Sequence, residues 1–561
     1  MRRRRSASLL ALLIALSLVA AACGDDDGGG GEGGTDTTEA KPVKGGTLVL
    51  GAEQEPDCAD WIASCAGASW GTFTMAAHTM PRAFDLTPDA KQVPSPLLDG
   101  EPTLDEGPPM KVTYKINPKA VWSDNTPITS SDFKYTWEQI KNGTDIYDQT
   151  GYRDIVSVDD SNPKTAVVTF NKPYASWKDL FGGFFGVYPK HLLPADEAGR
   201  NAAMKDGYTW SGGPWKIDHW TKDQEVVLVP NTNYWGNKPH LDKVVFRFFD
   251  DSAAELQAFK TNQVAMIYPQ AQQELVELFA LPSAKNDVVT SLSYEGIWFN
   301  TSKPPLDDKN VRMALAHATD RDAIVKTLFA QVQPDIKPIH AFMTPGNKEF
   351  YTSEPFKRYN RDLAKVDELL KASGYAKGSD GIYAKAGKPL QLEIATTAGN
   401  KRRERTQELL ISQWKEAGIG LKANNTTPGT LFGKWGPEGN FQIALFAQVP
   451  PSTDPGLCTT FCSENIPTPQ KTTGNNWTRT NSSSVDDAWR KVDAELSDDK
   501  RKDLVEQGQK ALADHLPGLP IDPFPDVILY NSAKIRGPIK HNFAYGAFAN
   551  MNEWWCDGGT C

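Results

Sequence analysis

A serine flanked by small residues is the first candidate for catalysis in this chain. The segment Gly67-Ala68-Ser69-Trp70-Gly71 fits the pattern in which serine hydrolases hold their nucleophile, after a strand and before a helix, with an aspartate and then a histidine later in the chain. The residues before it, Cys58 to Ala66, do not have the pattern of a buried strand. With 45 glycines in 561 residues, a chance match is unsurprising. A secreted serine hydrolase is therefore a distant alternative, and we predict no catalytic residue and no enzymatic activity.

The histidines do not form a metal-binding pattern. The eight histidines are scattered, and neither HExxH nor a phosphate-binding glycine loop occurs. His219, His317 and His340 can meet only through folding. The cysteines lack the two-residue spacing typical of zinc sites and have no histidine close by. The sequence therefore predicts no metal site and no cofactor.

Six of the seven cysteines fall into pairs that are close in the sequence. These pairs are Cys58 with Cys65, Cys458 with Cys462, and Cys556 with Cys561. An oxidising compartment favours disulfides, and three short loops are plausible positions for them. Because connectivity cannot be read from a sequence alone, this pairing is an expectation.

The N-terminus has the features of an export signal. Four arginines precede an apolar run from Leu9 to Ala22, which is too short to be a comfortable membrane span. The small residues Ala20 to Ala22 then stand directly before Cys23. This order resembles the lipobox of bacterial lipoproteins, in which a diacylglycerol is attached to the cysteine and cleavage makes it the new N-terminus, although Ala20 stands where a large aliphatic residue is usual. We therefore predict a signal peptide at residues 1–22, a lipid anchor on Cys23, and a location on the extracellular face of the cell membrane or in the periplasm.

A polar linker and an acidic body follow the predicted lipidation site. Residues 23–44 have almost no apolar content, so we expect a flexible tether. Without the four signal arginines, 56 basic residues face 70 acidic ones, a net charge of about −14. This charge argues against nucleic acid as a partner, since nucleic acid requires a basic face. No later apolar run approaches membrane-spanning length.

The remaining chain of about 515 residues is too long for one hydrophobic core and predicts two or three domains. Strands are predicted at 46–52, 112–116, 166–170, 226–229 and 244–248. Helices are predicted at 131–141, beginning at the capping-type Ser131, and at 253–261, 308–329, 362–372, 402–417 and 486–496. Strands and helices that alternate in this way predict mixed α/β layers.

Five segments carry a resemblance to a known family. They are Val121 to Pro127, Ser211 to Ile217, Asn231 to Trp235, Phe299 to Leu306 with Val311 to Leu315, and Tyr359 to Tyr375. In this order they resemble the extracellular solute-binding proteins of peptide-type ABC transporters for oligopeptides, dipeptides or nickel, also called family 5. The similarity runs from Gly45 to about Arg536. The motifs themselves have scaffold roles, such as the tight bend that Gly212-Gly213-Pro214 permits before a strand.

The resemblance implies an α/β fold with two lobes, of the periplasmic-binding-protein-like type II, with an additional third domain and interleaved connectivity. By the layout of the family, lobe I comprises residues 45–74, 208–300 and 514–561. The extra domain II comprises 75–207, and lobe III comprises 301–513. Such a receptor closes over a solute in the cleft between its lobes and delivers it to a membrane permease and its ATPase, without chemistry.

The resemblance also places two segments in the cleft, Gly51 to Pro56 and Phe441 to Asp454. Relatives hold an extended peptide between these segments by backbone hydrogen bonds. We predict that the solute contacts Glu53, Gln54, Trp298, Gln448, Val449, Asp454 and Trp477. Pro451 stands where relatives have the aspartate that binds the peptide amino group, and Leu445 stands where one relative has an arginine. The charged anchors for the peptide termini are therefore in doubt, although Asp454 is a further candidate for binding an amine. The resemblance implies an oligopeptide as the solute; the alternative is a receptor of the same fold for nickel, haem or another non-peptide solute.

Overall fold

The computed structural model describes residues 41–67, 69–183, 185–559 and 561. The predicted signal peptide, the predicted lipidation site Cys23 and most of the predicted tether lie outside these residues. Within the described residues, no helix combines the length and the apolar character that crossing a bilayer requires.

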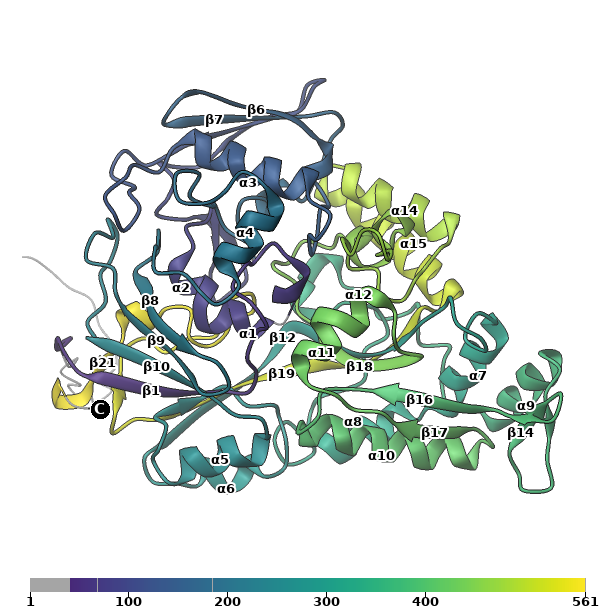
Figure 1. The fold of residues 1–561 in the computed structure, drawn as a ribbon. Coiled ribbons are helices and arrows are strands. Elements are labelled where there is room, and N and C mark those ends of the chain that lie inside the picture. The colour runs from purple at the N-terminus through teal and green to yellow at the C-terminus, as the bar shows by residue number, and fades with distance from the viewer. Residues whose placement is uncertain (1–40, 68, 184, 560) are drawn as a thin grey trace, which may run out of the picture. The chain divides into compact units, whose positions relative to one another are not determined.

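A ten-stranded mixed sheet forms the largest element (Figure 1). Its strands, in spatial order, are β17 (Gly420–Ala423), β16 (Gln391–Ala395), β18 (Ile443–Gln448), β12 (Ala284–Phe299), β19 (Gly518–Asn531), β11 (Met266–Ile267), β1 (Thr47–Ala52), β10 (Lys243–Phe248), β9 (Glu225–Pro230) and β8 (Trp215–Thr221). The predicted strands at 46–52, 226–229 and 244–248 are thus confirmed as β1, β9 and β10. Their alternating or continuous apolar side chains are buried against the core.

The long strands β12 and β19 form the centre of this sheet and were not predicted as such. They pair antiparallel from Ala284↔Asn531 to Trp298↔Gly518. Three prolines in β19 argue against a central strand, because proline cannot donate a ladder hydrogen bond. The structure accommodates Pro523 and Pro525 beside a register shift between Thr290 and Tyr294 of β12. Strand β19 therefore pairs with β12, although its sequence does not have the regular pattern of a central strand.

A separate four-stranded sheet is covered by helix α3 (Ser130–Asn142). Its order is β4 (Thr103–Asp105), β5 (Lys111–Lys115), β7 (Thr165–Phe170) and β6 (Ile155–Asn162). The predicted strands at 112–116 and 166–170 are confirmed as β5 and β7. The cap of α3 is Thr129 rather than the predicted Ser131, because the side chain of Asp132 accepts a hydrogen bond from the Thr129 backbone at 2.8 Å and closes a capping box.

The predicted helix at 308–329 is two helices, α7 (Lys309–Ala318) and α8 (Arg321–Phe329). Asp320 interrupts the run, since its side chain accepts a hydrogen bond from the Ala323 amide at 2.9 Å and caps α8. The other predicted helices are confirmed as α5 (Ser252–Lys260), α9 (Leu363–Ala372), α10 (Lys401–Glu416) and α14 (Ser483–Ala494).

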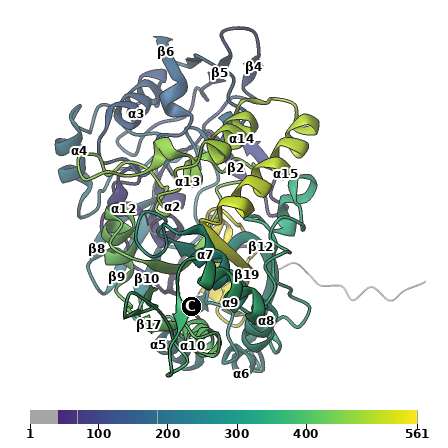
Figure 2. The same cartoon turned by 90° about the vertical axis from the view of Figure 1, so that its right-hand side faces the viewer.

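Helix α15 (Asp498–His515) was not predicted, and it packs against α14 (Figure 2). Its interior contains Gly508, which weakens a helical prediction. The glycine has a packing reason, because a Cβ atom there would lie 2.8 Å from Cε2 of Trp489 in α14. The helix is thus supported by close packing against α14, and its sequence lacks the broad apolar stripe from which a helix is predicted.

Short elements complete the fold. The strands are β2 (Phe84–Leu86), β3 (Gln92–Pro94), β13 (Ala376–Lys377), β14 (Tyr383–Lys385), β15 (Lys388–Pro389), β20 (Ile535–Arg536) and β21 (Trp555–Cys556). The helices are α1 (Ser69–Gly71), α2 (Ala77–Thr79), α4 (Glu197–Met204), α6 (Leu275–Phe279), α11 (Pro428–Thr430), α12 (Gly436–Glu438) and α13 (Cys458–Phe461). Single π-helical turns, Thr72–Ala76 and Leu431–Trp435, follow α1 and α11.

The three predicted cysteine pairs lie at disulfide distance. Their Cα–Cα separations are 5.8 Å for Cys58 and Cys65, 4.7 Å for Cys458 and Cys462, and 5.0 Å for Cys556 and Cys561. These values fall within the range that disulfides permit. The first pair closes a loop directly before Gly67, where a serine hydrolase would need a strand.

Candidate functional site

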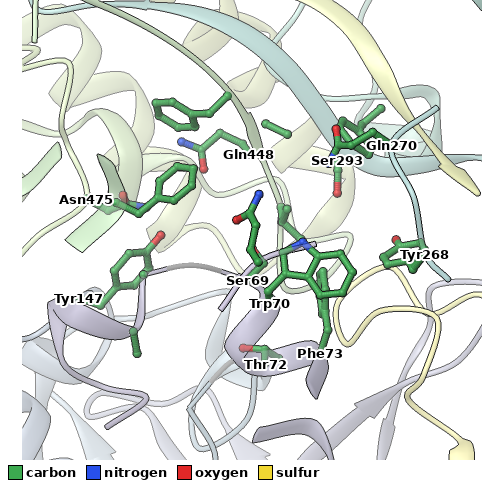
Figure 3. A pocket seen from close by; sticks show the side chains of 18 of the residues that line it. Ser69, Trp70, Thr72, Phe73, Tyr147, Tyr268, Gln270, Ser293, Gln448 and Asn475 are labelled. Carbon is green, nitrogen blue, oxygen red and sulfur yellow. The ribbon is translucent and has the colours of Figure 1, made fainter. Parts of the chain in front are cut away.

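A central cavity lies between the segments that follow β1 and β11 and the segments around β18 (Figure 3). Its empty space, including the part that is open to solvent, is about 1140 Å³. Trp70 and Phe73 enter it from α1 and the following π-helical turn, and Tyr268 from the segment after β11. The opposite wall carries Gln448 at the end of β18 and, farther along the chain, Asn475.

The wall of the central cavity is mostly aromatic. On one side, the ring of Trp70 lies 5.7 Å from that of Phe73 and 6.1 Å from that of Tyr268. On the other side, the ring of Phe446 lies 5.7 Å from Phe432 and 5.8 Å from Trp477. Such walls suit apolar and planar groups of a solute.

Charge is scarce in this cavity. The charged side chains among its described lining residues are Arg403 and Asp526. Arg403 is paired with Glu295, its Nε lying 3.2 Å from the carboxylate. Burial raises the pKa of Asp526 to about 7, so this carboxyl group carries little charge in mildly acidic solution. The cavity therefore offers no strong charged anchor.

A second chamber continues the cavity, and its empty space, including the part that is open to solvent, is about 1130 Å³. The two chambers share the lining residues Tyr147, Phe185, Gln448, Val449 and Asn475, so they form one cleft. Four aspartates line the second chamber, and no lysine, arginine or histidine of the described residues does: they are Asp148, Asp179, Asp454 and Asp493. Aromatic side chains thus line both chambers, whereas the aspartates are concentrated in the second.

Three of the predicted contact residues line the cleft and lie at or just after the end of a strand. Gln448 and Val449 line both, and Gln54 lines the central cavity. All three follow or end a strand of the large sheet, within the two segments that the family resemblance placed in the cleft. Their role in binding a solute remains a prediction.

Glu53 lies beside the cleft rather than in its central cavity. Its carboxylate accepts hydrogen bonds from the backbone amide and from Nε2 of Gln270, both at 2.8 Å. The side chain lines an adjoining acidic cavity together with Glu55 and Asp57. Substitution of Glu53 would leave donors of Gln270 unpaired, so Glu53→Ala would not test solute binding alone.

The two predicted tryptophans differ in position. Trp298 is fully buried in the core, donates a hydrogen bond to the Phe446 carbonyl oxygen at 2.8 Å, and does not line either chamber. This placement removes it from the residues that a solute can touch in this structure. Trp477 lines the central cavity, although only 5% of its surface is exposed.

Asp454 lines the second chamber but has partners within the protein. Its oxygens lie 2.9 and 3.0 Å from the guanidinium of Arg501, and the Ser176 hydroxyl donates to it at 2.6 Å. Because Arg501 neutralises this carboxylate, Asp454 is not a free anion for an amine. Pro451 lines the same chamber, and Leu445 is buried in the core.

Several lining residues were missed by the sequence analysis. Trp61, Tyr147, Phe185 and Phe524 come from segments far apart in the chain. Trp70 was noted only as part of the hydrolase-like pattern. No local signal marks such residues, since an aromatic side chain has the same pattern in a core as in a cleft.

The two alternatives considered above, a serine hydrolase and a metal site, have no support among the described residues. Ser69 lines the central cavity and begins α1, but the segment before it is a short 3₁₀ turn, Ser64–Ala66, and no described histidine lines either chamber. In the described part of the chain, one group of three possible metal ligands converges, formed by Cys458, Cys462 and Glu464, and its two cysteines are at disulfide distance from each other. His219, His317 and His340 do not line the cleft.

A mixed α/β fold whose large sheet joins two cores, with a cleft lined by distant segments, is typical of two-lobed binding proteins. The model of the bacterial extracellular solute-binding proteins, family 5, matches residues 106–465. The chain belongs to this family.

Relatives and solved structures agree with this assignment. The oligopeptide-binding protein OppA of Mycobacterium tuberculosis is 29% identical over 387 residues, which are 67% of this chain and 64% of that protein. The chain thus matches just under two thirds of the length of this curated relative. Among solved structures, AppA of Bacillus subtilis in complex with a nonapeptide has a TM-score of 0.82 at 20% identity, covering 92% of this chain and 100% of that chain. NikZ of Campylobacter jejuni in complex with Ni(L-His) has a TM-score of 0.78 at 21% identity, covering 91% and 99%. These similarities confirm the predicted two-lobed periplasmic-binding-protein-like fold.

Proposed function

We propose that this chain is the extracellular receptor of a peptide-type ABC importer, which captures an oligopeptide in the cleft and delivers it to the permease and ATPase in the membrane. Membership of family 5 and the cleft of two connected chambers support this proposal. Relatives named for oligopeptides or solved with a nonapeptide support the choice of solute. A solute receptor needs no catalytic group, in keeping with a cleft that lacks histidine among its described lining residues.

An open sheet edge in the cleft carries the proposal of a peptide solute. Strand β18 pairs with β12 along its whole length, but with β16 only at Ile443 and Ala444. Beyond the Leu445 carbonyl, which accepts a hydrogen bond from the Thr396 hydroxyl, β18 has no paired strand on that side among the described residues. An extended peptide can pair with such an edge through its backbone and leave its side chains to the aromatic walls.

Backbone pairing can be tested with the exported protein and a pair of matched peptides. We expect a nonapeptide to raise the melting temperature without being cleaved, because a ligand that binds only the native state stabilises it. The same peptide with N-methylated backbone amides keeps its side chains but loses its donors, and it should bind at least about tenfold more weakly. Equal binding of both peptides would refute backbone pairing, and peptide cleavage would refute the receptor itself.

A receptor for nickel or haem is the second candidate, favoured by the similarity to the fold of NikZ. The cleft gives it little support, because its described lining has no histidine and one arginine, Arg403. Mass spectrometry of the solute released by denaturing the purified protein distinguishes the two. A released metal complex or porphyrin in place of peptide would favour this candidate.

We further propose that a lipid on Cys23 holds the receptor at the membrane. The small residues before Cys23 and the polar tether after it support this arrangement. A Cys23→Ser variant should appear in the culture medium or remain uncleaved, while the wild-type protein partitions with membranes. Membrane retention of a processed Cys23→Ser variant would contradict lipid anchoring.

A further inference from the structure

Two carboxyl groups of the acidic second chamber, those of Asp179 and Asp493, have no ion-pair partner among the described residues. Asp454 is neutralised by Arg501, as described above. Asp179 accepts a hydrogen bond from Nε2 of Gln92 at 2.6 Å, and the carboxylate of Asp493 has no hydrogen-bond or ion-pair partner among the described residues. Burial, reinforced by the charge of Asp454, raises the pKa of Asp179 to about 7 and that of Asp493 to about 8. Neither carboxyl group forms an ion pair, because burial and the charge of Asp454 outweigh the attraction of Arg501.

The hydroxyl of Tyr174 is a second, independent feature of the chamber. Only 7% of Tyr174 is exposed, and the residue lines the chamber. Its hydroxyl has no hydrogen-bond partner among the described residues. Burial, and then the charges of the surrounding aspartates with Asp493 first, raise the pKa of this phenol, which therefore stays protonated. The hydroxyl oxygen is therefore free to accept a hydrogen bond from a ligand in the chamber.

We propose that the second chamber binds a positively charged organic group, an ammonium or a guanidinium, between Asp179 and Asp493, with the Tyr174 hydroxyl as a third contact. This proposal rests on the proposed function and adds the chemical class of the preferred solute: an apolar or aromatic body for the central cavity and a cationic group for the second chamber. The rings of Tyr147 and Phe185, which line both chambers, also favour a cation.

The arrangement suits an organic cation better than a metal ion. A metal ion needs several ligand atoms that converge within its coordination sphere. Among the described residues, no three carboxylates of this chamber bring oxygen atoms within 4.8 Å of one another. The N–H groups of an ammonium or guanidinium can instead reach separate oxygens, and their charged hydrogen bonds are strong where water is excluded.

Three peptides of one length can test the preference with the exported protein. The first is Gly-Phe-Ala-Phe-Gly amide with a free amino terminus, the second is its N-acetylated form, and the third is the N-acetylated form with lysine at the centre. We expect the neutral second peptide to bind at least about tenfold more weakly than one of the two cationic peptides. The cationic peptide that binds more tightly shows whether the preferred amine is the amino terminus or a side chain.

Variants of the protein then show which residues cause the preference for a cationic peptide. The double variant Asp179→Asn with Asp493→Asn should reduce the ratio of cationic to neutral affinity to about one, and Tyr174→Phe should reduce it in part. The neutral peptide, measured on the same variants, reports that the cleft has formed. Asp499→Asn is the matched control, since Asp499 has a side chain that is 92% exposed, and it should keep the wild-type ratio.

The outcomes separate the two proposals. Equal affinities of the three peptides for the wild type, or an unchanged ratio in the double variant, would overturn the cation site while leaving a peptide receptor. If none of the peptides binds, the proposed peptide function fails, and the cation site is decided with tryptamine and its neutral N-acetyl derivative. A preference for tryptamine that the double variant removes would support the site, and equal or no binding of the two compounds would overturn it.

Discussion

Asp60 and Arg200 form an ion pair that water does not reach. Their side chains are 1% and 0% exposed, and Nε of Arg200 lies 2.8 Å from Oδ2 of Asp60. The pair ties the loop of the first cysteine pair to α4. Removing one partner of a buried pair leaves the other charge desolvated and uncompensated, which costs about 3–5 kcal/mol.

We therefore expect Asp60→Ala to lower the free energy of unfolding by about 3–5 kcal/mol, measured by urea denaturation. Lys357→Ala is the control, because Lys357 and Glu354 form an exposed pair, 60% and 65% exposed, and such pairs contribute about 0–1 kcal/mol. Equal effects of the two substitutions would show that the buried pair adds no more than a surface pair.

Asp522 in β19 should make stability depend on pH. Its side chain is 1% exposed, and the nearest guanidinium nitrogen, Nη1 of Arg402, lies 3.9 Å away. Burial raises the pKa of Asp522 to about 7, with the attraction of Arg402 as the opposing cause. Between pH 4 and 7, the folded protein therefore holds a proton that the unfolded chain has released, so stability falls as the pH rises through this window.

Substituting Asp522→Asn should remove this dependence. We expect the free energy of unfolding of the wild type to fall more steeply from pH 5 to pH 7 than that of the variant, by at most about 1.4 kcal/mol per pH unit. Urea denaturation at both pH values measures the two slopes. A variant with the slope of the wild type would show that Asp522 does not titrate in this range.

At the scale of elements, the β12–β19 pair depends on a glycine. Gly518 pairs with Trp298, and a Cβ atom on it would lie 2.6 Å from the carbonyl oxygen of Ile297. Since backbone cannot move aside without disturbing the ladder, Gly518→Ala should lower the free energy of unfolding by about 1–3 kcal/mol. Gly107→Ala is the control, because a Cβ atom there meets only Oδ1 of Asp105, at 3.2 Å. Equal unfolding midpoints for the two variants would contradict this view of the strand pair.

The sequence predicted those elements whose pattern is local. Strand β1 and helix α10 were found within a residue or two of their bounds, because their apolar side chains repeat with the period of the element. Strand β19 was missed because its prolines argue against a strand, and the irregular register that accommodates them is set by β12. Pairing with a distant segment, and not the local sequence pattern, thus determines that β19 is a strand.

The candidate site was likewise predicted only in part from the sequence. Gln54 and Gln448 line the central cavity, and both lie in segments that the family resemblance placed in the cleft. Trp298 and Trp477 could not be distinguished by sequence, since burial of an indole depends on which distant segments cover it. The aspartates that make the second chamber acidic, such as Asp179 and Asp493, come from segments that only the fold brings together.

At the scale of the whole receptor, hydrogen bonds join the predicted domain II to the predicted lobe III beside the second chamber. Nζ of Lys471 donates to Oε1 of Gln149 at 2.8 Å, and the hydroxyl of Ser176 donates to Asp454 at 2.6 Å. Both bonds lie next to residues that line the second chamber. They are therefore positioned to hold the cleft closed, as hinge closure around a solute requires.

Removing both bonds should favour the open cleft. We expect Ser176→Ala with Lys471→Ala to increase hydrogen–deuterium exchange of residues 145–152 and 446–449, because local opening exposes the amides of the cleft walls. Peptide affinity should fall by about tenfold, since two neutral or singly charged hydrogen bonds contribute on the order of 1 kcal/mol each. Lys502→Ala is the control, because Lys502 pairs with Asp499 in its own helix, 3.1 Å away. Unchanged exchange in the double variant would mean that other contacts hold the lobes together, and that the polar bonds beside the second chamber do not govern the opening of the cleft.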